Sequence, residues 1–364
     1  MSKLRSLARC MSNSEAQLTE IAEVICGTPV SCIRLQEGGG NSRVFEVITP
    51  TKSFALKEYP NQNIDEWSRV SREFGGLKFL VTSGVQNLPK PIGYTTNPDV
   101  AVYEWIDGER VACPAASDID TALAFLSDLK SVGEYPGASD VPLATESCLT
   151  IASLNSQIER RINRLNEVLV SSPGLGNFLR SLDAFVVEQR GRLDEFVKSR
   201  KYPGDRELKK EYQTLSPSDF GFHNALRRPD GGITFLDFEY FGWDDPVRVI
   251  SDFILHPGME LDNSAIEYFV AGACDLYCAD PLLEVRLDAM FPMIGLRWVL
   301  ILLNEFLPER LSFRVRAGNH DPHKLQMRQL EKAECLFHQG IHKRWEIIEY
   351  VLSSKVKPHG GSIG

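Results

Sequence analysis

The sequence has no apolar stretch long enough to cross a lipid bilayer. Its longest apolar run, residues 298–303, is far shorter than the roughly 20 residues that a transmembrane helix requires. The N-terminal segment contains basic side chains but lacks the apolar core of a secretory signal. Because both signals are missing, we expect a cytoplasmic protein with no membrane partner.

Paired cysteines and an excess of basic charge are also missing. The eight cysteines are scattered, without a Cys-x-x-Cys pair or zinc-finger spacing, which predicts free thiols in a reducing compartment. The formal net charge is −9, whereas nucleic-acid binders carry clustered Lys and Arg, so we expect no nucleic-acid partner. The 364 residues, 43% of them hydrophobic, are enough for a globular protein of about two structural units.

The N-terminal third alternates between strand patterns and turns after one amphipathic helix. The helix is predicted over 13–25, with Asn13 or Ser14 as its N-cap, and strands over 30–35, 44–48 and 53–59. A glycine-rich loop, EGGGNSR, joins the first two strands, and glycine lets backbone amides approach a phosphate closely. A tight hairpin turn without a ligand remains the alternative. The loop residues that we expect to cover phosphates are Gly38, Gly39, Gly40, Asn41 and Ser42.

The strand predicted over 53–59 carries a lysine that could neutralise phosphate charge. Phe54-Ala55-Leu56-Lys57 matches the V-A-I-K pattern of nucleotide-binding strands, although a lone strand lysine is more often solvated. A helix is predicted over 64–80 and supplies Glu73 as the partner of Lys57, with Glu66 as the alternative. The pair Gly75-Gly76 weakens this helix, so we expect it to bend or break there.

Two further strand patterns, 88–94 and 100–108, complete a five-stranded interpretation. The second ends near Glu104 and Ile106, whose backbone groups we expect to face an adenine ring; a buried strand that ends in a turn is the alternative. Helical periodicity then dominates. We place the boundary between an N-terminal lobe (1–105) and a C-terminal lobe (106–364) there, and we predict helices over 118–131, 149–170, 174–199, 205–212 and most of 262–352.

Residues 215–239 carry three polar groups at a suggestive spacing. Asp219 precedes Asn224 by five positions, and a predicted hairpin around Pro229-Asp230-Gly231-Gly232 then delivers Asp237 at the end of a strand. One carboxylate can accept a proton from a hydroxyl, while an amide and a second carboxylate hold Mg²⁺ on the phosphates of a nucleotide. Asp and Asn are also common turn residues, so the spacing gains weight only from the upstream loop and lysine.

The histidines give no independent signal for a metal site. His338 and His342 lie one helical turn apart, but Lys343 and Arg344 follow, which favours an exposed helix face. His320 and His323 fall in a polar loop and are interpreted as structural or solvated.

Taken in order, these motifs resemble the aminoglycoside phosphotransferase and choline kinase superfamily, the small-molecule branch of the protein-kinase-like fold. The resemblance covers roughly residues 30–255 and implies an α+β, bilobal fold with a small antiparallel sheet lobe and a larger helical lobe. It implies that Asp219 is the catalytic base, that Asn224 and Asp237 bind Mg²⁺, and that Lys57 binds phosphate. It rests on GGGNSRVFEV, FALK, the Glu73 helix, VYEWIDGE, SPSDFGFHN and ITFLDFEYFGWDDP.

The sequence departs from the family string H-G-D-L-H-x-G-N around the expected base. Pro217 and Ser218 replace the His-Gly before Asp219, and His223 replaces the Gly before Asn224. The Asp and the Asn are kept, so the expected reaction stands, but the departures weaken any inference to an antibiotic substrate. The absence of an A-P-E segment and of an activation loop argues against a protein substrate.

The sequence therefore predicts transfer of a phosphoryl group from ATP or GTP, with Mg²⁺, to a hydroxyl of a small molecule. A sugar, amino sugar, amino alcohol or aminoglycoside-like acceptor remains open, as does the oligomeric state. Asp244, Asp245 and Glu305 are candidates to line the acceptor pocket, although solvation or helix capping would also explain them. The alternative function is that of a nucleotide-binding pseudokinase or regulatory scaffold without turnover.

Overall fold

The computed structural model describes residues 14–36, 42–60, 67–169, 173–316 and 321–355. Within these ranges an antiparallel sheet comes first in the chain and helices predominate after it. The expected α+β fold class, a small antiparallel sheet part followed by a larger helical part, is confirmed. The boundary between residues 105 and 106 stays a prediction.

The first helix, α2 (Glu15–Cys26), begins where the sequence predicts a cap. The Ser14 hydroxyl accepts a hydrogen bond from the Gln17 amide, and the Gln17 side chain accepts from the Ser14 amide in return. This reciprocal capping box satisfies two donors that the first turn of a helix leaves free. The helix ends at Gly27, whose φ of 64° suits a residue without a side chain.

Five strands form one fully antiparallel sheet in the order β1-β2-β3-β5-β4. Side chains alternate along the central strand β3, as in any strand. Phe54 and Leu56 pack with Leu18 of α2 on one face, which leaves Lys57 on the other face. The strands are β1 (Cys32–Leu35), β2 (Arg43–Ile48), β3 (Ser53–Glu58), β4 (Pro91–Thr96) and β5 (Asp99–Glu104).

The helix α3 (Arg69–Thr82) packs against the face of the sheet opposite α2. The expected break at Gly75-Gly76 is wrong, because the helix is continuous across this pair, and a bend there stays a prediction. Gly76 is buried, and a Cβ atom there would lie 2.6 Å from Cδ1 of Phe241, which belongs to the C-terminal part. The missing side chain therefore lets a ring from the second part of the chain pack directly on α3. The predicted helix start at residue 64 lies outside the described residues.

The C-terminal part is mostly helical, and its helices vary from one turn to many. The α-helices are α4 (Ala116–Val132), α5 (Ile151–Asn166), α6 (Pro173–Arg200), α7 (Pro246–Leu255), α8 (Asn263–Leu276), α9 (Leu283–Leu302), α10 (Pro308–Arg316), α11 (Pro322–Cys335) and α12 (Ile341–Lys355). Short 3₁₀ segments are η2 (Ala138–Asp140), η4 (Lys210–Tyr212), η5 (Phe222–Asn224) and η6 (Leu303–Phe306), and a short π-helix, η7 (Leu336–Gly340), joins α11 to α12.

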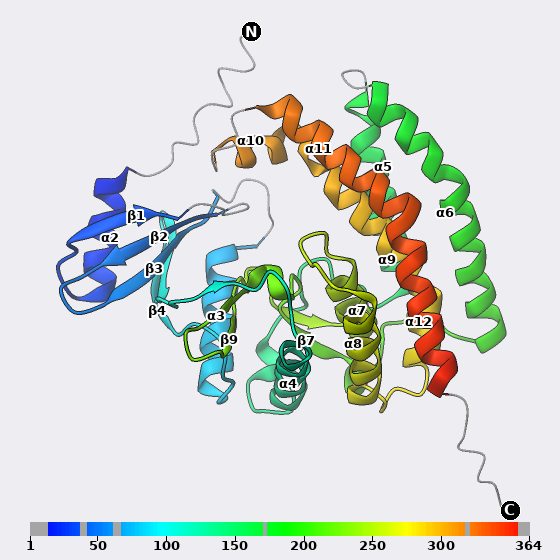
Figure 1. The fold of residues 1–364 in the computed structure, drawn as a ribbon, viewed down its shortest axis with the longest axis horizontal. Coiled ribbons are helices and arrows are strands. Elements are labelled where there is room, and N and C mark those ends of the chain that lie inside the picture. Colours follow the sequence, from blue (N-terminus) through cyan, green and yellow to red (C-terminus); the bar gives the residue numbers. More distant parts are fainter. Residues whose placement is uncertain (1–13, 37–41, 61–66, 170–172, 317–320, 356–364) are drawn as a thin grey trace, which may run out of the picture.

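The core of this part is organised around α9. This helix contacts α5, α6, α7, α11 and α12. The uninterrupted run 298–303 led us to expect no stretch long enough to span a membrane, and this is wrong by length and composition, because Leu283–Phe306 is long and apolar enough. Of its apolar window, 83% is buried inside the protein, as in a core helix. In Figure 1 the sheet and α2 lie at one end of the molecule, α6, α11 and α12 lie at the other, and α3 lies between them.

The segment 215–239, which the sequence singles out, contains short strands separated by turns. The predicted hairpin is confirmed as β8 (Ala225–Arg227) paired with β9 (Ile233–Phe235), with β6 (Glu109–Arg110) added to β8. Separately, β7 (Thr214–Ser216) pairs with β10 (Gly242–Asp244). The Phe235 amide donates to the Asn87 carbonyl at 2.8 Å, which attaches the hairpin to the segment between α3 and β4.

One predicted helix is wrong. Residues 205–212 contain only the short 3₁₀ turn η4 instead of an α-helix. Leu208 is the apolar residue that this segment buries, so no apolar stripe favours a longer helix there.

Candidate active site

Lys57 is fixed at the centre of a buried set of charges. Its side chain leaves β3 on the face that α3 covers, and its Nζ lies 2.7 Å from Glu73 Oε2. The same Nζ lies 2.7 Å from Asp237 Oδ1 and 3.6 Å from Glu239 Oε2. The structure therefore brings together Lys57, Glu73 and Asp237, three residues from the sequence prediction. Glu66, the alternative partner, lies outside the described residues.

Glu73 connects three segments through its two carboxylate oxygens. Oε2 accepts hydrogen bonds from Lys57 Nζ and from the Tyr59 hydroxyl, both at 2.7 Å. Oε1 accepts from the backbone amide of Phe238 at 3.2 Å. Because Phe238 directly follows Asp237, the same carboxylate holds both the strand lysine and the backbone beside the expected metal ligand.

Glu239 is a further site residue that the sequence analysis did not select. Its Oε1 lies 2.7 Å from Arg69 Nη1, and its Oε2 accepts from the Ser42 hydroxyl at 3.4 Å. Arg69 begins α3, and Ser42 belongs to the glycine-rich loop, so Glu239 links two N-terminal elements to the segment after the hairpin. Its presence in the triplet Asp237-Phe238-Glu239 was the available signal, since a carboxylate two positions after Asp237 lies close to it in space.

The electrostatics keep Lys57 charged. Burial alone would lower the pKa of Lys57, but the carboxylates of Asp237, Glu73 and Glu239 together raise it well above its ordinary value. Burial and the neighbouring Asp237 raise the pKa of Glu239, and Lys57 and Arg69 oppose that rise. The ammonium of Lys57 thus stands where three carboxylate oxygens converge within 4.8 Å of one another.

The hairpin places Asn224 next to the segment that carries Asp237. The Leu236 amide donates to the Asn224 carbonyl at 2.7 Å, directly before Asp237 in the chain. Asp237 itself has a φ of 66°, a left-handed conformation that costs a non-glycine residue free energy. Asp237 lies two residues after the end of β9, and its side chain, 33% exposed, reaches Lys57.

Asp219 is surrounded by nitrogen donors. Its Oδ2 accepts from Asn224 Nδ2 at 3.2 Å, and its Oδ1 lies 3.1 Å from His223 Nε2 and 3.6 Å from His256 Nε2. Burial would raise the pKa of Asp219, but the hydrogen bonds that it accepts from His223 and Asn224 lower it well below its ordinary value. Asp219 is therefore a carboxylate at neutral pH. His256 lies far along the chain, so no local spacing could have indicated it.

The residues fit the hard, oxygen-preferring Mg²⁺ that the fold family implies. Asn224 uses its amide nitrogen on the backbone oxygen and on Oδ2 of Asp219, which leaves its amide oxygen as the atom available to a metal. Asp237 supplies a partly exposed carboxylate. Bound there with a nucleotide, Mg²⁺ would neutralise phosphate charge.

The structure describes only part of the expected nucleotide-binding set. Gly38, Gly39, Gly40 and Asn41 lie outside the described residues, whereas Ser42 is buried against Glu239. The half-buried Glu104 and Ile106 lie at and just after the end of β5. The Glu104 amide donates to the Lys90 carbonyl at 2.8 Å, so that amide is already used within the chain.

The three acidic residues considered for the acceptor pocket are buried in ion pairs instead. Asp244 pairs with Arg248, Asp245 with Arg286, and Glu305 with Arg314. Asp245 also caps α7 by accepting from the Val247 amide. Because each carboxylate already has a cationic partner, none of the three supplies free negative charge to an acceptor.

Known proteins similar to this chain are found by comparing structures but not by comparing sequences. No protein-family model matches the chain, and no curated protein matches it significantly. A spectinomycin phosphotransferase in complex with ADP and spectinomycin is similar with a TM-score of 0.62 at 12% identity, over 95% of this chain and 99% of that one. The chain has the fold of small-molecule kinases.

Two other solved structures of this fold support the same conclusion. An ethanolamine kinase of Plasmodium vivax gives a TM-score of 0.56 at 14% identity, over 94% of each chain. An amicoumacin kinase in complex with AMP-PNP and Ca²⁺ gives 0.55 at 14% identity, over 94% of this chain and 99% of that one. At these identities the likeness defines the fold and leaves the acceptor open.

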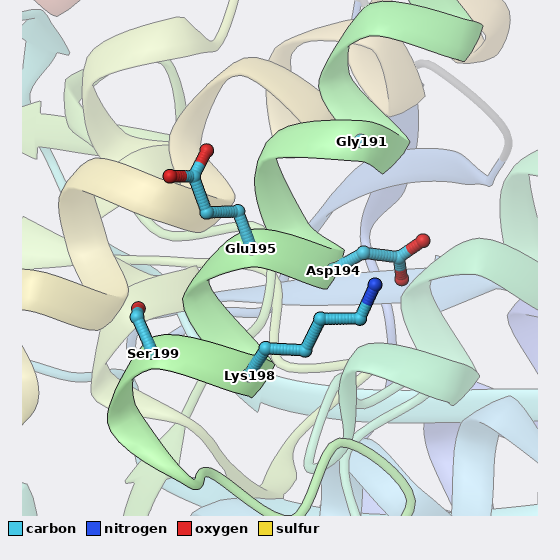
Figure 2. Close-up of a pocket in the computed structure, with 5 residues that line it drawn as sticks. All are labelled: Gly191, Asp194, Glu195, Lys198 and Ser199. Carbon is cyan, nitrogen blue, oxygen red and sulfur yellow. The ribbon is translucent and has the colours of Figure 1, made fainter.

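A surface hollow on α6 lies outside the site formed by Lys57, Asp219 and Asp237. Exposed residues on successive turns of one helix line it, and Figure 2 shows Asp194 and Lys198 on one side of the helix, with Glu195 and Ser199 on the other. None of them belongs to the predicted site. The lining residues are Gly191, Asp194, Glu195, Lys198 and Ser199.

Proposed function

We propose that the chain transfers the γ-phosphoryl group of ATP to a hydroxyl group of a small molecule. The observation that carries the proposal is the contact of Lys57 with both Glu73 and Asp237, at 2.7 Å each. This contact joins the strand lysine to the segment that follows the hairpin, next to Asn224 and Asp219. A lysine, a metal-binding pair and a base brought together in this way suit phosphoryl transfer, which depends on positioning and charge neutralisation.

Each residue has one task in this proposal. Lys57, held by Glu73, neutralises phosphate charge. Asn224 and Asp237 hold Mg²⁺, which supplies further neutralisation when it is bound with the nucleotide. Asp219 accepts a hydrogen bond from the acceptor hydroxyl, orients it, and receives its proton as the new bond forms. Its pKa, which lies below the ordinary range, suits it to orient the hydroxyl and makes strong proton abstraction before bond formation unfavourable.

The acceptor is a small molecule whose charge remains to be found by experiment. Structures of this fold include kinases for spectinomycin, choline, ethanolamine and amicoumacin. The neutralised state of Asp244, Asp245 and Glu305 removes the acidic side chains that we had considered for a cationic acceptor. Neutral sugars and amino alcohols therefore belong in the acceptor panel beside aminoglycosides.

The test combines nucleotide binding with a search for acceptors. Calorimetry with ATP and with GTP, each with and without Mg²⁺, should give binding that depends on Mg²⁺ and that Asp237→Asn weakens. Asp194→Asn, the same change on the exposed face of α6, is the matched control and should bind as the wild type does. ADP release is then measured across sugars, amino alcohols and aminoglycosides. Binding without acceptor-stimulated ADP release across the panel would favour a nucleotide-binding scaffold.

A further inference from the structure

Two imidazole rings stack on each other beside Asp219. His223 belongs to η5, and His256 directly follows α7, so two separate segments supply them. The ring centroids lie 3.4 Å apart and the ring planes differ by 14°. The Nε2 atoms of both rings face the same oxygen of Asp219, at 3.1 Å for His223 and 3.6 Å for His256.

The tautomer of His256 follows from its other nitrogen. The Gly258 amide donates to Nδ1 of His256 at 3.1 Å, so Nδ1 carries a lone pair and the neutral ring carries its proton on Nε2. Burial lowers the pKa of His256 to about 3, so the ring is neutral at physiological pH. Trp298 contacts the ring edge-on at 4.8 Å and is itself fixed by its Nε1 donating to Asp252 at 2.7 Å.

His223 is constrained to the same tautomer for a different reason. Its Nδ1 is buried, and no described residue forms a hydrogen bond with it. A proton on Nδ1 would bury an unsatisfied donor, whereas a proton on Nε2 is donated to Asp219. The space between Gly221 and Nδ1 of His223 is narrow. A Cβ atom added at Gly221 would lie 2.8 Å from Nδ1 and 2.8 Å from the Met259 sulfur.

A metal ion does not suit this cluster as well as hydrogen bonds do. Asp219, His223 and His256 present one ligand atom each within 4.8 Å, which by count could bind a transition metal. Imidazole lone pairs lie in the ring plane, and two nearly parallel planes 3.4 Å apart do not direct them to one point. The Nε2 of His256 also already carries a proton in the tautomer that Gly258 selects.

We propose that His223 is a positioning residue for Asp219 and that His256 holds the His223 ring in place by stacking on it. This proposal rests on the proposed phosphotransfer, because it assigns the pair a role toward the base of that reaction. His223 donates its Nε2 proton to Oδ1, and Asn224 donates to Oδ2. The Nε2 atoms of both rings face Oδ1, whereas Oδ2 accepts from Asn224 and, with two lone pairs, keeps one that the acceptor hydroxyl can use. The pair thereby decides which oxygen of Asp219 meets the acceptor.

The kinetic test uses matched variants of both histidines. His223→Phe keeps a ring to stack on His256 but removes the donor, whereas His223→Gln keeps a donor without the ring. We expect His223→Phe to lower kcat about 10- to 100-fold with an unchanged KM for ATP, because loss of positioning acts on the chemical step. His223→Gln should recover most of the loss. His256→Ala should lower kcat, and His256→Phe, which preserves stacking, should lower it much less.

The rate is measured as hydrolysis of Mg·ATP by water and, with any active acceptor from the panel, as ADP release. The thermal unfolding midpoint of each variant separates loss of positioning from loss of fold. Equal losses in His223→Phe and His223→Gln, or a raised KM for ATP at unchanged kcat, would overturn the role of His223.

A spectroscopic test on the wild type does not depend on turnover. Long-range ¹H–¹⁵N correlation spectra of ¹⁵N-histidine-labelled protein at neutral pH should show both rings as neutral Nε2–H tautomers. Nδ1–H tautomers at either ring would overturn the proposal even if the chain is an active kinase. If the wild type neither binds nor hydrolyses Mg·ATP, the phosphotransfer function itself fails, and these spectra still report whether the pair is built as described. Zn²⁺ titrated alone should leave the spectra unchanged, and stoichiometric tight binding would identify a metal site instead.

Discussion

Arg248 donates a hydrogen bond from Nη2 to the hydroxyl of Ser218 at 2.7 Å. Ser218 has a φ of 71°, a left-handed conformation that favours glycine, and it directly precedes Asp219. Arg248 is buried and also pairs with Asp244 and Asp252. Ser218, which stands where the family string has Gly, is thus held in a left-handed conformation by a hydrogen bond from the buried guanidinium of Arg248.

Two substitutions at Ser218 should separate its hydroxyl from its backbone. Ser218→Ala removes the partner of a buried cation and keeps the unfavourable φ, so we expect a loss of about 1–3 kcal/mol in the free energy of unfolding. Ser218→Gly loses the same hydrogen bond but relieves the backbone, so its loss should be smaller. Urea unfolding measures both. Equal losses in the two variants would show that the backbone conformation is not strained.

Removing the ammonium of Lys57 should lower the free energy of unfolding as well as the affinity for the nucleotide. Lys57→Met leaves Glu73 and Glu239, both buried, without their shared cation, which should cost about 3–5 kcal/mol. Adding Glu73→Gln removes the carboxylate that Lys57→Met leaves without a cation, since Glu239 still pairs with Arg69. The double variant should therefore lose less stability than the two single variants together. Guanidinium unfolding of the four proteins measures this coupling, and strict additivity would contradict it.

The neighbouring glycines of α3 should respond in opposite directions. Gly75 is exposed, and a Cβ atom there meets nothing within 4 Å, so Gly75→Ala should stabilise the protein by about 0.5–1 kcal/mol through helix propensity. Gly76→Ala places a methyl group against the Phe241 ring and should destabilise by about 1–3 kcal/mol. The thermal unfolding midpoint distinguishes them. A stabilised Gly76→Ala would mean that the Phe241 ring moves away easily.

The buried neutral His256 should make the protein sensitive to mild acid. Burial lowers its pKa to about 3, against an unfolded value of about 6.5. The unfolded chain therefore binds the proton first as the pH falls. The contribution of His256 to stability is complete above about pH 6.5 and is lost as the pH falls toward 3, by at most about 1.4 kcal/mol per pH unit. Urea unfolding of the wild type and of His256→Phe from pH 7 to pH 4 tests this, and parallel curves would contradict it.

The sequence predicted those features that arise from local patterns and fixed spacings. Alternation along residues 53–58 places Lys57 on the face opposite Leu56, and the period of the helix with Glu73 brings that carboxylate to it. The turn at 229–232 was sufficient to predict the hairpin before Asp237.

What the sequence did not predict depends on contacts between distant segments. His256 meets His223 only because α7 packs beside η5, and Glu239 meets Arg69 only because α3 lies against the hairpin segment. The expected break at Gly75-Gly76 failed for the same reason. Helix propensity favoured a break, but the close approach of Phe241 gives Gly76 a packing role inside a continuous helix.

The role of Asp219 as the base can be measured by comparing Asp219→Asn with the wild type at saturating Mg·ATP and an acceptor that stimulates ADP release. Asp219→Asn keeps the shape of the site and a partner for His223, but it cannot take the proton of the hydroxyl. We expect Asp219→Asn to bind Mg·ATP as tightly as the wild type and to lose at least about 100-fold in kcat, since a positioned base contributes about 10²–10⁴-fold. Full turnover by Asp219→Asn would show that Asp219 is not the base.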